Sequence, residues 1–119
     1  MKPLYHPAVE DVTVEGILYA LSNPVRVQIL KEIMRSNSPK SCSDFLSLPD
    51  RVIPKSTLSQ HFKILREAGL IRSERKGVSM RNTPRCQELR PRFGRLIGEI
   101  LAAYAEEYSA VAGADSPES

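Results

Sequence analysis

The sequence lacks long apolar runs and has only two cysteines. A membrane-spanning helix needs about 18 or more consecutive apolar residues, so we expect no membrane span. The first residues also lack the apolar core of a signal peptide, and we therefore expect a cytoplasmic protein. A chain of 119 residues that is 41% hydrophobic and 26% charged predicts one ordinary globular domain.

The residues that bind metals or carry out catalysis are scattered along the chain. His6, Cys42, His61 and Cys86 stand singly, with no C-x-x-C, whereas a closed zinc site takes four ligands in paired spacings. There is no G-x-S-x-G, phosphate-binding loop, H-E-x-x-H, or Cys–His–acid set at a usable spacing. We therefore expect no enzyme, no metal site and no cofactor.

Negative charge is scarce in the middle of the chain. Residues 54–95 carry eleven basic and three acidic side chains, a net charge of +8. Residues 1–53 carry six of each sign, and residues 96–119 carry five acids and no Lys or Arg. Because the positive charge is concentrated in one segment, the sequence predicts a protein that binds a polyanion. A solvated basic surface is the alternative.

The spacing of apolar residues predicts mostly helices and one hairpin. Asn23 and Pro24 are typical of a helix start, and Gly69 is typical of a helix end. Short segments on both sides of Lys76 and Gly77 predict a β-hairpin. The predicted elements are an extended arm over 1–9, helices over about 10–21, 24–34, 41–48 and 54–68, a hairpin over 70–83, a long helix interrupted or started near Pro91, and a disordered tail over 113–119.

This order predicts a mainly α fold with a small β-hairpin. Three helices followed by a basic hairpin form a winged helix-turn-helix, and two further helices enclose it at the N- and C-terminal ends. We therefore expect one DNA-binding and dimerisation domain over residues 10–112 between the arm and the tail.

The helix over 54–68 has two different faces. With Leu58 at zero degrees, Phe62 and Leu65 fall within about 40° of it, and polar residues lie opposite. Such a helix can pack on the protein with one face and reach DNA bases and phosphates with the other. His61 lies at the edge, so a packing role stays open, and Arg66 has a phosphate or an acidic partner as alternatives. The predicted DNA contacts on this helix are Lys55, Ser56, Thr57, Ser59, Gln60, His61, Lys63 and Arg66.

The hairpin is the predicted wing. Its turn carries Arg75 and Lys76, and Arg81 lies on the returning strand. A narrow minor groove attracts arginine through its strong negative potential, so we expect these three residues to contact DNA beside the helix. A solvated turn is the alternative.

Two segments of the sequence resemble the ArsR-type winged-helix repressors. Residues 20–30 (ALSNPVRVQIL) resemble the family's A-L-(S/A)-(D/N)-P-x-R-x-x-I-L opening. Residues 55–71 (KSTLSQHFKILREAGLI) resemble its recognition helix and the exit from it. The resemblance covers about residues 10–105. It implies a homodimer that binds a partly palindromic operator in double-stranded DNA and leaves it when a signal arrives.

The sequence departs from the family at its sensing sites. Ser41 and Ser43 stand where arsenic- and cadmium-sensing members have Cys-x-Cys, and the last predicted helix lacks the His of the zinc sensors. Both usual metal sites are therefore expected to be absent, and the inducing signal is unknown. Cys42 and Cys86 are a possible redox pair, with buried inert thiols as the alternative.

The two outer helices predict a dimer interface. The last helix has a wider apolar stripe than a core of this size needs, and the first helix adds three apolar side chains. The alternative is that both helices only cover their own core. A thiol- or metal-responsive repressor and a winged-helix protein-interaction module remain as alternative functions. The predicted interface residues are Ile17, Leu18, Leu21, Phe93, Ile97, Ile100, Leu101, Tyr104 and Tyr108.

Overall fold

The computed structural model describes residues 4–35, 40–41, 47–48 and 51–115, with side chains for residues 4–35 and 52–107. A three-stranded sheet has the strand order β1-β5-β4, and β2 pairs with β3. The elements are η1 (Val9–Asp11), α1 (Val14–Ala20), α2 (Pro24–Arg35), β1 (Lys40–Ser41), β2 (Ser47–Leu48), β3 (Arg51–Val52), α3 (Lys55–Glu67), β4 (Ile71–Lys76), β5 (Ser79–Pro84) and α4 (Cys86–Asp115).

The first two helices begin at capping side chains. The Thr13 hydroxyl accepts a hydrogen bond from the Gly16 amide at 3.0 Å, which starts α1. The Asn23 side chain accepts a hydrogen bond from the Val25 amide at 2.8 Å. Since such oxygens satisfy amides that have no partner inside the helix, both starts are fixed locally by the sequence. The predicted cap and Pro24 start of α2 agree with this geometry.

Helix α3 ends at a glycine that no other residue fits. Gly69 has a φ of 89°, and a Cβ added there would lie 2.6 Å from Val12 Cγ2. The Gly69 amide bonds the Arg66 carbonyl, and the Leu70 amide bonds the Leu65 carbonyl, each at 3.0 Å. This is the Schellman pattern of a helix end, and it turns the chain directly into β4.

Strands β4 and β5 form the predicted hairpin. They pair antiparallel from Ile71 opposite Pro84 to Lys76 opposite Ser79, which leaves a two-residue turn. Gly77, the first residue of that turn, has a φ of 62°. Two-residue turns with glycine first match the right-handed twist of paired strands. The short strand β1 extends the sheet on the outer side of β5.

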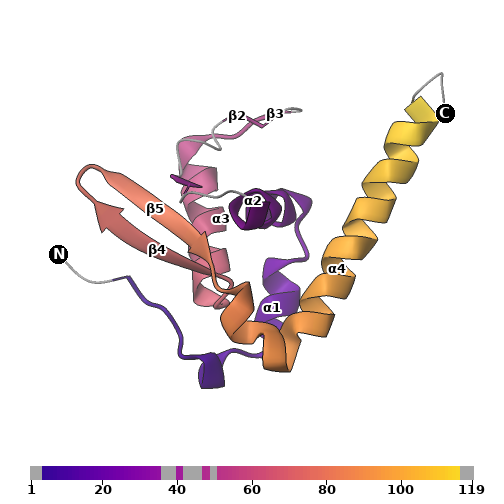
Figure 1. The fold of residues 1–119 in the computed structure, drawn as a ribbon. Coiled ribbons are helices and arrows are strands. Elements are labelled where there is room, and N and C mark those ends of the chain that lie inside the picture. Colours follow the sequence, from indigo (N-terminus) through magenta and orange to yellow (C-terminus); the bar gives the residue numbers. More distant parts are fainter. Residues whose placement is uncertain (1–3, 36–39, 42–46, 49–50, 116–119) are drawn as a thin grey trace.

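One core joins all four helices and the hairpin. Figure 1 shows α2 in the middle, with α3 and the hairpin on one side and α4 on the other. The buried apolar side chains include Ile29 from α2, Leu65 from α3 and Ile71 from β4. The structure confirms the expected mainly α fold with one small hairpin. None of the described helices combines the length and apolarity needed to cross a membrane.

The last helix is longer than the sequence predicted. Helix α4 runs from Cys86 to Asp115 with Pro91 inside it, and Figure 1 shows a bend near its start. Proline lacks the N–H that would bond the preceding turn, so the expected interruption corresponds to a bend within one helix. The predicted tail began at residue 113, but α4 continues to Asp115. Residues 116–119 lie outside the described residues.

The short helix predicted over 41–48 is wrong at both ends of that range, where the structure has strands. Ser41 belongs to β1, and Ser47 and Leu48 form β2. Residues 42–46, which contain Cys42, lie outside the described residues. The sequence signal there was only two inward-facing apolar residues, whereas pairing with β5 depends on residues about 40 positions away (Lys40 opposite Asn82).

Candidate nucleic-acid interface

Helix α3 presents a polar face to solvent. Leu58, Phe62 and Leu65 are buried in the core. The opposite side is exposed, as the angular positions in the sequence predicted. The exposed polar residues of this face are Lys55, Ser56, Thr57, Ser59, Gln60 and Lys63.

His61 is fixed at the edge of that face by a buried arginine. The His61 Nδ1 lies 3.4 Å from the guanidinium Nη1 of Arg26. The same guanidinium donates to the carbonyls of Ala20 at 2.7 Å and Tyr19 at 3.0 Å. Burial, reinforced by the charge of Arg26, lowers the pKa of His61. The structure thus places one ring nitrogen of His61 toward the interior and against α2.

Arg26 was not predicted as a site residue, although it is the arginine of the resembling segment. It is only 6% exposed, and its guanidinium lies 5.2 Å from the centre of the Tyr19 ring. Burial lowers its pKa, but an arginine stays charged at any ordinary pH. Arg26 therefore supports α3 from behind rather than facing a ligand.

The wing carries an exposed basic tip. Arg75, Lys76 and Arg81 are all exposed, and Arg81 lies opposite Glu74 in the register of the hairpin. Lower in the hairpin, the Ser73 hydroxyl donates to the Asn82 side chain at 2.6 Å, and both residues are buried. A satisfied buried polar pair fixes the register of the two strands. The tip is consequently a positively charged projection at the end of a hairpin whose strand register is fixed.

Arg66 is less exposed than the polar residues of that face. Its side chain is half-buried, and its Nε is buried with no hydrogen-bond partner among the described residues. Its positive charge acts on His6 of the N-terminal arm. Arg66 therefore lies at the edge of the exposed face, one turn after Lys63, where its charge also acts on the arm.

The N-terminal arm is attached to the base of the wing. The Ser73 amide donates to His6 Nε2 at 3.0 Å, Arg85 donates to the Pro7 carbonyl at 2.8 Å, and Arg92 donates to the Val9 carbonyl at 3.1 Å. Sequence reasoning missed these contacts because they join residues 67 to 83 positions apart.

The charges of three arginines act on His6. Burial is the main cause that lowers the pKa of His6, followed by the charges of Arg72, Arg66 and Arg85, while Glu74 acts in the opposite direction. Arg85 is itself buried and holds both carboxylate oxygens of Glu88, which lowers the pKa of that carboxyl. His6 is therefore kept neutral as an acceptor for the Ser73 amide.

The outer helices divide the predicted interface residues into two groups. Ile17, Leu21, Phe93 and Ile97 are buried in the core of the single chain, so they offer no surface to a partner. This corrects their assignment to an interface. Side-chain surface remains on Leu18, Ile100, Leu101 and Tyr104, and the side chain of Tyr108 lies outside the described residues. The Tyr104 hydroxyl donates to the Leu21 carbonyl at 2.9 Å.

The described part of the chain contains no group of three or more His, Cys, Asp or Glu residues that could hold a metal ion. Cys86 is half-buried as a free thiol, and burial raises its pKa. A raised pKa leaves less thiolate, which is the reactive form. Cys42, its possible redox partner, lies outside the described residues.

Comparison with known proteins agrees with this geometry. A helix-turn-helix domain family matches residues 21–74, from the end of α1 into β4. The sequence has no significant match among curated proteins.

Solved structures share the fold along most of the chain. An ArsR-like transcriptional regulator from Rhodococcus sp. RHA1 is 24% identical with a TM-score of 0.56, covering 87% of this chain and 92% of that one. Rv0081 of M. tuberculosis is 26% identical with a TM-score of 0.57, covering 85% and 89%. HlyU from Vibrio cholerae N16961 is 24% identical with a TM-score of 0.58, covering 76% and 90%. The chain therefore contains a helix-turn-helix segment and shares the fold of solved structures that include an ArsR-like transcriptional regulator.

Proposed function

We propose that this protein is a sequence-specific DNA-binding repressor that acts as a homodimer in the cytoplasm and is not an enzyme. The observation that carries the proposal is the exposed face of α3, where Ser56, Thr57, Ser59, Gln60 and Lys63 stand on a helix whose other face is buried. A helix of this kind fits the major groove, where amide and hydroxyl groups read base edges and lysine contacts phosphates.

The wing supplies a second contact beside the helix. The exposed Arg75 and Lys76 at the turn are suited to the DNA backbone or to a narrow minor groove. Both α3 and the wing belong to the segment with a net charge of +8, and the outer end of α4 carries only acidic charge. DNA is therefore expected at the α3 and wing side and not at the far end of α4.

The dimer is expected to place two copies of α3 on one face of the duplex. Successive major grooves on one face lie roughly 34 Å apart, which predicts a partly palindromic operator with half-sites one turn apart. The exposed apolar side chain of Leu18 on α1 and the half-buried Ile100 on α4 are the proposed contact surface, whereas Leu101 faces a groove beside α2.

The proposal is tested by selecting bound fragments from randomised duplex DNA and measuring their affinity at low and moderate salt. We expect a recurring inverted repeat, an affinity that falls steeply with salt, and reduced transcription from a promoter that contains the repeat. A winged-helix protein-interaction module would select no sequence, and that result would overturn the proposal.

The inducing signal is proposed not to be one of the metals sensed by the usual family sites. Zinc, nickel or arsenite added to the protein–operator complex should leave the DNA bound. Release of the DNA by any of them would assign a metal-responsive role instead. Release by an oxidant, absent in a Cys86→Ser variant, would assign a thiol-based role.

A further inference from the structure

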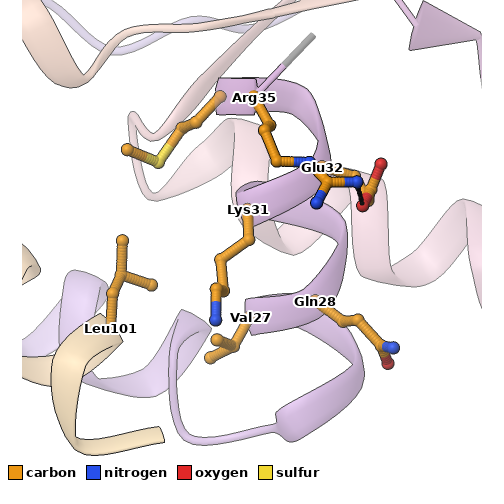
Figure 2. Close-up of a pocket in the computed structure, with 7 residues that line it drawn as sticks. Val27, Gln28, Lys31, Glu32, Arg35 and Leu101 are labelled. Atoms are coloured by element: carbon orange, nitrogen blue, oxygen red, sulfur yellow. Dashed lines mark hydrogen bonds and ion pairs between the residues drawn. The ribbon is translucent and has the colours of Figure 1, made fainter. Parts of the chain in front are cut away.

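A groove lies between α2 and α4, on the side of α2 that faces away from the hairpin. It has a volume of about 540 Å³ and is bounded by α2 along one wall and by Leu101 of α4 on the other (Figure 2). Ligand pockets for small organic molecules have volumes of about 300–1,000 Å³, so the groove is of suitable size.

The walls of the groove combine apolar side chains with one cation. Val27 lies about one turn before Lys31 on α2 and Met34 about one turn after it, so all three line the same side of the helix. Figure 2 shows the Lys31 amine directed toward the space between Val27 and Leu101. The side chain of Lys31 is half-buried.

Lys31 has no ion-pair partner among the described residues, whereas its charged neighbours neutralise each other. The Arg35 guanidinium holds the Glu32 carboxylate at 2.7 Å. The groove consequently carries a net positive charge at one point, next to apolar walls. An amine that is partly removed from water favours a bound anion more than a fully exposed amine does.

We propose that this groove binds a small organic anion with an apolar body, such as a carboxylate on an aliphatic chain or ring. The carboxylate lies against the Lys31 amine, the apolar body lies along Met34 and Leu101, and the buried Val27 closes the floor of the groove. Methionine has a flexible and polarisable side chain, so Met34 adapts to bodies of different shape.

The site is placed to act on the recognition helix. Helix α2 carries Arg26, which contacts His61 of α3, and a ligand in the groove holds α2 at a fixed separation from α4. Ligand binding by itself does not require DNA binding. The use of the ligand as the signal that releases DNA rests on the proposed function.

The test uses octanoate as the probe and methionine methyl groups as the reporters. In protein labelled with ¹³C at its methionine methyl groups, octanoate should shift the Met34 signal in a saturable way and leave Met80 of the wing unchanged. Octanol and octylamine of the same chain length should bind at least about tenfold more weakly, because neither presents an anion to Lys31.

Two variants remove one positive charge each from the free protein. Lys31→Met should weaken octanoate binding about tenfold, and Lys31→Arg should restore most of it. Arg95→Met, on the exposed side of α4, should bind octanoate as the unaltered protein does.

Several results would overturn the ligand site. They are the absence of a saturable Met34 shift at millimolar octanoate, an equal response to octylamine, and full affinity in Lys31→Met. A Met34 signal that depends on protein concentration and not on octanoate would show that a second copy fills the groove, which also overturns it.

The DNA measurement is separate. Octanoate that binds without lowering operator affinity overturns the regulatory use alone. A protein that binds octanoate but no DNA sequence overturns the proposed function and leaves the ligand site supported.

Discussion

At the scale of single residues, Arg26 shows how the recognition helix is supported. Its guanidinium donates to the carbonyls of Ala20 and Tyr19 and meets the ring of His61, so one planar cation joins α1, α2 and α3. Lysine has no comparable fork of donors. The sequence identified Arg26 as part of a family pattern, but its partners are three-dimensional neighbours that no local spacing predicts.

Gln60 is the residue on α3 for which we expect the clearest effect on sequence recognition. Its exposed amide can both donate to and accept from a base, which alanine cannot do. Gln60→Ala should cost on the order of 1–3 kcal/mol at one base pair of the selected operator and leave other positions unchanged. Competition with single-base operator variants measures this directly.

The matched control is Gln87→Ala, since Gln87 is an exposed glutamine of α4 that lies outside the proposed interface. It should bind every operator variant as the unaltered protein does. An unchanged base preference in Gln60→Ala would remove Gln60 from base recognition.

The two histidines predict how stability depends on pH. The pKa values of both His6 and His61 are lowered from an ordinary value of 6.5, chiefly by burial. Below pH 6.5 the unfolded chain therefore binds more protons than the folded protein, and the free energy of unfolding falls. Urea unfolding at intervals from about pH 7.5 to 5.5 should show this loss.

Variants separate the two contributions. His6→Gln keeps an acceptor for the Ser73 amide but cannot titrate, so its stability should depend less on pH. His61→Gln should flatten the remaining slope. Glu88 titrates below this window, because its pKa is lowered from 4.5. A wild-type slope in both variants would show that other groups control the acid response.

At the scale of elements, the sequence predicted those parts whose signal is local. The apolar period of α3, the cap of α2 and the glycine turn of the hairpin all lie within a few residues, and the structure has these elements near the expected bounds. Strand β1 and the attachment of the arm through His6 depend on distant partners, whereas β2 pairs with the nearby β3. The residues of β1 and of the arm carry no periodic pattern that reveals those distant partners.

The wing predicts a measurable electrostatic effect. Arg75→Ala removes one exposed cation from the tip, so binding should weaken for all sequences alike. The slope of log affinity against log salt should fall by about 1, because one fewer counterion is released. Fluorescence anisotropy at several salt concentrations gives the slope.

Arg95→Ala on α4 is the comparison for the wing variant, because it removes the same charge from an exposed position away from the hairpin. It should keep the full slope. If Arg75→Ala also keeps it, the wing does not touch DNA.

At the scale of the whole molecule, the apolar residues of one helix divide into buried and exposed ones, which the sequence alone cannot distinguish. On α1, Ile17 is fully buried, whereas Leu18, the next residue, is 46% exposed. Both residues fit the apolar periodicity of the predicted helix, so the sequence does not separate the buried residue from the exposed one. Only the packing of the helices in three dimensions shows which side chains the single chain already covers.

The exposed position of Leu18 predicts how a substitution there changes the association of the proposed dimer. Leu18→Asp places a charge on the exposed part of α1, so it should shift sedimentation toward monomer and weaken operator binding. The fold should persist, because Leu18 is not part of the buried core.

Val52→Asp is the control, since Val52 on β3 is 79% exposed and lies outside the proposed interface. It should leave the sedimentation unchanged. A monomeric unaltered protein, or a Leu18→Asp variant that remains fully dimeric, would contradict this interface.

A single hydrogen bond, donated by the Ser73 amide, joins the wing to His6 of the arm. The N–H of Ser73 points at His6 Nε2, 67 positions away in the chain, and not at a neighbouring strand. The hydrogen exchange of this amide therefore reports how often the arm detaches from the wing. The amides of the surrounding strand ladder report the opening of the hairpin itself. The exchange rate of this one amide therefore measures the detachment of the arm, which a side-chain probe on the wing would not detect.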